Sequence, residues 1–138
     1  MSADDLSELF EGRTRLVEKL VQRSDPLGDA HEVIRGLSEE EKLEALNAHP
    51  AIGAKTLSRR SAAEQGANDD PETLAELERL NREYEDRFGF RFVVFVNRRP
   101  KSEIVPVLRE RLTRSRDEEL DTAVQELVAI AEDRWRRS

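Results

Sequence analysis

The sequence contains no cysteine among its 138 residues, and this absence excludes several kinds of chemistry. Without thiols there can be no disulfide framework, no cysteine nucleophile and no sulfur-ligated metal site. Neither a glycine-rich phosphate-binding loop nor the G-x-S-x-G turn of serine hydrolases occurs. Any catalytic function must therefore depend on other polar side chains.

Long apolar runs are absent as well, since no stretch approaches the roughly 18 apolar residues of a membrane-spanning helix. Residues 1–5 are acidic and lack the apolar core of a signal peptide, and residues 136–138 carry no lipidation or peroxisomal signal. The formal net charge of −7 argues against general binding to a nucleic-acid backbone. These features predict a soluble cytoplasmic protein without a nucleic-acid or membrane partner.

The sequence is rich in apolar residues at helical spacing, separated by helix-start and helix-stop signals. Capping boxes of the form Ser-x-x-Glu begin at Ser38, Ser61 and Ser115. The clearest helix is expected to start at Asp70-Pro71 and to end before Gly89. Other helices are expected over residues 5–10, 16–24, 26–36, 39–49, 102–114 and 116–134. The pattern predicts an all-α, single-domain bundle of about seven or eight helices that spans residues 1–138.

Residues 90–96 are the exception to this helical pattern. The run Phe-Arg-Phe-Val-Val-Phe-Val is typical of a strand, because it is β-branched and aromatic. No second convincing strand exists for it to pair with, and a lone strand is not a stable unit. We therefore expect a buried extended segment or the start of a helix.

His49 is the first candidate functional residue, because imidazole is the only side chain with an unperturbed pKa near neutrality. Pro50 disfavours the α conformation at His49, which should place the imidazole at a bend where a helix ends. The alternative is a capping or core histidine. The other histidine, His31, lies among acidic residues and is expected to be solvated, so the sequence predicts no metal site.

Ser61, Glu64 and Gln65 form a second group of polar candidates. Glu64 has a purely structural interpretation as the last member of a capping box. The other interpretation is a functional role beside a ligand. Both can hold, because a helix N-terminus offers N–H groups and a positive dipole end to an anionic ligand.

Arg134 lies four residues after Ile130 and therefore continues the apolar face of the last helix. One interpretation is a terminal arginine whose charged end reaches the solvent. The other is a guanidinium that points into a pocket and holds a carboxylate through two hydrogen bonds.

Taken together, these residues resemble one family, the 2-oxo-4-hydroxy-4-carboxy-5-ureidoimidazoline (OHCU) decarboxylases, from about Phe10 to the C-terminus. The motifs that carry the resemblance are Asn47-Ala48-His49-Pro50, Ser61-x-x-Glu64-Gln65, Leu80-Asn81-x-x-Tyr84-x-x-x-Phe88-Gly89-Phe90-x-Phe92-Val93, Arg111-Leu112 and Ala129-Ile130-Ala131-x-x-Arg134.

The resemblance implies an all-helical homodimer that converts OHCU to (S)-allantoin, the last step of the uricase route, without metal or organic cofactor. The family's catalytic pair matches His49 and Glu64. Its substrate-holding positions match Pro50, Ser61, Gln65 and Arg134, and backbone groups of a segment here running from Phe90 to Val94 line its pocket. On this view the strand-like run forms part of a pocket wall.

The resemblance also implies a mechanism, in which the substrate's own ring accepts the electron pair left by CO2. His49 would exchange a proton with the substrate, Glu64 would fix an N–H group, and Arg134 with Gln65 would orient the anion. Two alternatives remain: a non-catalytic helical interaction module, and an enzyme for another ureido or purine-derived acid. The second is left open because Ala51-Ile52-Gly53 departs from the Asp-Leu-Ala of many members.

Overall fold

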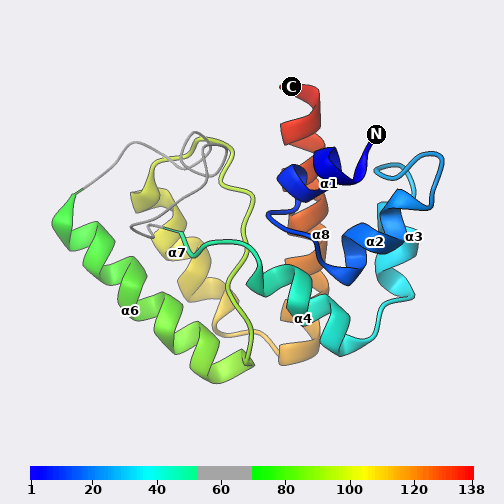
Figure 1. Cartoon of the computed structure of the whole chain (residues 1–138). Coiled ribbons are helices and arrows are strands. Elements are labelled where there is room, and N and C mark those ends of the chain that lie inside the picture. Colours follow the sequence, from blue (N-terminus) through cyan, green and yellow to red (C-terminus); the bar gives the residue numbers. More distant parts are fainter. Residues whose placement is uncertain (53–69) are drawn as a thin grey trace.

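The computed structural model describes residues 1–52 and 70–138, and the chain in these ranges forms helices joined by short irregular segments (Figure 1). The helices are α1 (Ala3–Leu9), α2 (Arg15–Val21), α3 (Ala30–Arg35), α4 (Glu39–Asn47), α6 (Pro71–Phe88), α7 (Lys101–Arg111) and α8 (Arg116–Arg136). The described ranges contain no strand. The all-α prediction of about seven or eight helices is therefore confirmed.

The long helix α8 is the central element of the fold. It contacts α1, α3 and α4 on one side, while α6 and α7 pack against each other on the other side (Figure 1). Ala123, Leu127 and Ala131 of α8 are completely buried in the common core. None of the helices in the two described ranges is long and apolar enough to cross a bilayer.

Local signals account for most helix starts. The predicted capping boxes at Ser38 and Ser115 are both present, and each serine accepts a hydrogen bond from the backbone three residues later. Asp70 caps α6 ahead of Pro71, and Gly89 ends that helix in the left-handed conformation (φ 79°). The third predicted box, at Ser61, lies outside the described residues.

The start predicted for the third helix was wrong. Asp25-Pro26 was expected to open it, but α3 begins at Ala30. The side chain of Asp25 accepts from the backbone N–H of Gly28 (3.3 Å). The backbone carbonyl of Asp25 accepts from the N–H of Asp29 (2.9 Å). These bonds close a separate turn, because a short aspartate side chain competes with helical hydrogen bonding.

Residues 90–96 form the buried extended segment that the sequence predicted, and they run between the α6–α7 pair and α8 (Figure 1). Their backbone groups are bonded to side chains instead of to another strand. Asn47 Oδ1 accepts from the N–H of Arg91 (3.0 Å), and Arg111 Nη1 donates to the carbonyl of Val93 (2.7 Å). Glu126 Oε1 also accepts from the N–H of Phe95 (3.4 Å), and the Arg99 guanidinium donates to the carbonyls of Phe95 and Val96.

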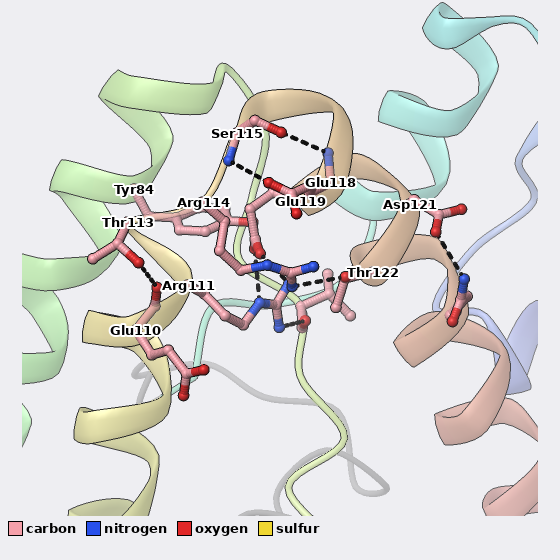
Figure 2. Close-up of polar contacts among 12 residues, drawn as sticks. Tyr84, Glu110, Arg111, Thr113, Arg114, Ser115, Glu118, Glu119, Asp121 and Thr122 are labelled. Atoms are coloured by element: carbon pink, nitrogen blue, oxygen red, sulfur yellow. Dashed lines mark hydrogen bonds and ion pairs between the residues drawn. The ribbon is translucent and has the colours of Figure 1, made fainter.

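A buried ionic cluster supports this segment from the side of α6, α7 and α8 (Figure 2). Glu119 is completely buried and accepts from Tyr84 Oη (2.6 Å), Arg111 Nε (2.7 Å) and Arg114 Nη1 (3.0 Å). Burial and the bond to Glu119 raise the pKa of Tyr84, so its hydroxyl remains a donor. The Arg111 guanidinium also lies 4.6 Å from the centroid of the Phe92 ring.

Candidate active site

One cavity brings together residues that are far apart in the sequence. It is lined by His49 and Pro50 after α4, by Val94 of the extended segment and by Arg134 near the end of α8. Its other described wall residues are Ile52, Phe92, Val93, Phe95, Val96 and Ile130. Most of its described lining side chains are therefore apolar, and the imidazole of His49 and the guanidinium of Arg134 also line it.

His49 lies immediately beyond the C-terminus of α4, as Pro50 predicted. Its backbone N–H donates to the carbonyl of Leu46 (3.2 Å), which closes the last turn. The side chain is only 4% exposed, and its Nε2 atom has no hydrogen-bond partner among the described residues. A buried nitrogen without a partner is costly, so an atom in this position is suited to a ligand.

The electrostatic environment keeps this imidazole neutral. Burial lowers the pKa of His49 to about 4, and the positive charges of Arg134 and Arg91 act in the same direction, whereas Glu11 opposes them. At neutral pH the side chain can therefore accept a proton.

This shift predicts a pH dependence of stability. Between pH 6.5 and about 4 the unfolded chain protonates His49 while the folded protein does not, so the free energy of unfolding decreases as the pH falls. The full effect is about 3 kcal/mol. Urea unfolding across this range should show a steeper loss in the wild type than in His49→Asn. If the free energy of unfolding fell equally with pH in the two proteins, the buried imidazole would not be neutral in the folded state.

Arg91 holds the histidine segment in place. Its Nη1 donates to the carbonyl of His49 and to that of Asn47 (3.2 Å), while its backbone is bonded to the Asn47 side chain. Sequence reasoning assigned no role to Arg91. The available signal was a single charged residue inside an otherwise apolar run.

Arg134 is buried, with 2% of its side chain exposed, and not solvated at the helix end. Its Nη1 donates to the carbonyls of Glu8 (3.3 Å) and Leu9 (3.1 Å), and its Nη2 lies 3.0 Å from Glu11 Oε1. The sequence placed Arg134 on the apolar face, and this placement is confirmed. It did not identify Glu11, because no local pattern links residue 11 to residue 134.

Not every predicted site residue is at the cavity. Phe90 packs against the rings of Tyr84 and Phe88, and the Arg116 guanidinium lies 5.6 Å from its ring centroid. Its side chain therefore belongs to the aromatic core, although Val94 of the same segment lines the cavity. The predicted residues Ser61, Glu64 and Gln65 lie outside the described ranges.

The polar groups of this cavity are suited to binding a small anionic ligand. The guanidinium can hold a carboxylate, and the imidazole can exchange a proton beside it. The apolar wall lowers the local dielectric constant, which strengthens both interactions. No group of three or more His, Asp or Glu residues in the described ranges is arranged to hold a metal ion.

Known proteins are similar to this chain in sequence. Residues 3–136 match the family model for OHCU decarboxylase. The 2-oxo-4-hydroxy-4-carboxy-5-ureidoimidazoline decarboxylase of Haloferax volcanii is 31% identical, over 94% of this chain and 83% of that protein. The uric acid degradation bifunctional protein PucL of Bacillus subtilis is 30% identical, over 93% of this chain and 28% of that protein.

Solved structures give the same result. A crystal structure of OHCU decarboxylase in the presence of (S)-allantoin superposes with a TM-score of 0.79 at 27% identity, and the match covers 94% of both chains. A crystal structure of (S)-allantoin synthase, at 22% identity, superposes with a TM-score of 0.70 over 96% of this chain and 47% of that one. The second likeness concerns the fold alone.

Proposed function

Because the chain belongs to the OHCU decarboxylase family, we propose that the cavity between α4, α8 and the extended segment is where it converts OHCU to (S)-allantoin. The protein is a decarboxylase of urate degradation. The observation that carries the placement is that His49, Pro50, Val94 and Arg134 line one pocket. A non-catalytic scaffold offers no reason for this convergence.

Decarboxylation leaves an electron pair on a ring carbon, and this pair must be delocalised. The bond between a ring carbon and the carboxylate breaks, CO2 leaves, and the pair passes into the conjugated ring of the substrate. A ring nitrogen takes up a proton as it receives the pair, the hydroxyl group loses its proton as a carbonyl forms, and a ring carbon is protonated in the product. In total, one proton is consumed for each carboxylate lost. Proton transfer is therefore the step to which the protein contributes.

His49 is the proposed proton carrier. Its neutral imidazole can take the hydroxyl proton, and a proton delivered to the ring carbon from one face produces the S configuration. Nε2 has no partner among the described residues, which supports this role. Positioned acid–base groups contribute roughly 10²–10⁴-fold to a rate.

Arg134 is the proposed anchor for the substrate carboxylate. A guanidinium has five N–H donors in a fixed plane, so it can bond to α1 and to a ligand oxygen at the same time. Pro50, Val94 and the backbone from Phe90 to Val94 would shape the wall. Ser61, Glu64 and Gln65 remain proposals from the resemblance, with Glu64 fixing an N–H group of the substrate.

The activity is tested by circular dichroism. Uricase and its partner hydrolase generate OHCU from urate, and the optically active product is followed with and without this protein. We expect much faster appearance of the (S)-allantoin signal when the protein is present. An unchanged rate, equal to spontaneous decay, would reject the function.

We propose in addition that the enzyme is a homodimer, as the resemblance implies, and that it is cytoplasmic, as the sequence predicts. Sedimentation equilibrium would then give twice the chain mass of 15.9 kDa, and a mass of one chain would reject the dimer.

A further inference from the structure

Glu11, which lies just beyond α1, has an unusual backbone conformation for a glutamate. It follows Phe10, the C-cap of α1, and adopts a left-handed backbone conformation with φ 64°. This conformation is unfavourable for a residue with a Cβ atom and is usually taken by glycine or asparagine. Its side chain is nevertheless only 11% exposed. The backbone conformation is therefore associated with a carboxylate turned into the protein.

The carboxylate of Glu11 meets the guanidinium of Arg134, with 3.0 Å between Oε1 and Nη2. The carbonyls of Glu8 and Leu9 accept from the Nη1 atom of the same guanidinium. Three oxygen atoms from the end of α1 thus surround one side of a cation that also lines the cavity. These contacts restrict the rotation of the guanidinium and therefore help to fix its position toward the cavity.

Charge balance gives a second reason for a carboxylate at this point. The described charged groups that act on His49 are Arg134 of α8, Arg91 of the extended segment and Glu11 after α1. Glu11 is the one among them that favours a protonated imidazole. Its removal would leave Arg134 and Arg91, both of which lower the pKa of His49, without this opposing effect.

We propose that Glu11 is a positioning residue of the decarboxylase, which holds Arg134 in the orientation that presents the substrate carboxylate to His49. The inference rests on the proposed function and extends it to a residue outside the cavity lining. Glu11 acts through Arg134 and through the charge around His49, and it does not itself contact the reacting atoms.

The test compares Glu11→Gln, Glu11→Asp and the wild type in the circular dichroism assay over a range of pH. Glu11→Gln keeps the shape but removes the charge, and we expect kcat to fall roughly tenfold or more because the anchor is misplaced. The acidic limb of the kcat/KM profile should move to lower pH, because Glu11 raises the pKa of His49. Glu11→Asp keeps the charge but has a shorter reach, so kcat should fall while the acidic limb stays in place.

Glu8→Gln is the matched control. Glu8 lies on α1, its side chain is exposed, and only its backbone carbonyl contacts Arg134, so we expect wild-type kinetics. Wild-type kcat in Glu11→Gln would overturn the proposal. The proposal would also fail if the activity of Glu11→Gln fell only in proportion to its folded fraction, while the acidic limb of its kcat/KM profile stayed at the wild-type pH. An inactive wild type would instead reject the proposed function, which separates the two failures.

Discussion

His49→Asn should lower kcat for (S)-allantoin formation by roughly 10²–10⁴-fold. Asparagine has a similar size and can form hydrogen bonds, but it cannot exchange a proton near neutral pH. The wild-type imidazole is buried, neutral and adjacent to Arg134 in the cavity. Since Arg134 remains, substrate binding should change far less than turnover, so KM should stay close to the wild-type value.

The same assay measures this loss, and far-ultraviolet circular dichroism verifies that the variant is folded. His31→Asn is the control, because the other histidine is exposed on α3 and should tolerate the change. Near-normal turnover in a folded His49→Asn protein would remove His49 from the mechanism. It would leave the fold and the family membership unaffected.

Glu119→Ala should lower the free energy of unfolding by about 3–5 kcal/mol. Glu119 is completely buried and is bonded to Tyr84, Arg111 and Arg114 (Figure 2). Its removal leaves the Arg111 guanidinium, which is 7% exposed, as a buried charge without a counterion. The cost arises mainly from that uncompensated charge and not from the lost hydrogen bonds.

The effect should extend to the active site, because Arg111 also bonds to the carbonyl of Val93 in the cavity wall. Urea unfolding gives the stability, and the dichroism assay gives the activity of the folded fraction. Asp117→Ala, at an exposed position two residues before Glu119 on α8, is the control and should cost about 0.5 kcal/mol. A loss below 1 kcal/mol in Glu119→Ala would show that the cluster relaxes or admits water. If Glu119→Ala does not fold, Glu119→Gln gives a milder version of the same test.

Local features of the sequence were sufficient to predict most of the fold. The serine capping boxes, the Asp70-Pro71 start and the Gly89 stop each act within a few residues, so their effect can be read without knowing the tertiary structure. Asp25-Pro26 shows the limit, because two local patterns competed there and the turn replaced the helix start.

The cavity could not be predicted from local sequence patterns alone. The bend at His49 and the apolar face around Arg134 follow from neighbouring residues, whereas the pairing of Arg134 with Glu11 spans almost the whole chain. The alternation within residues 90–96 could not decide that Phe90 joins the aromatic core while Val94 faces the cavity. Helix ends and apolar faces depend on short-range sterics and hydrogen bonds, which the order of residues specifies directly. The pairing of distant charges, and the direction of each side chain in the buried segment, depend on how the helices pack. Only the tertiary structure decides that packing.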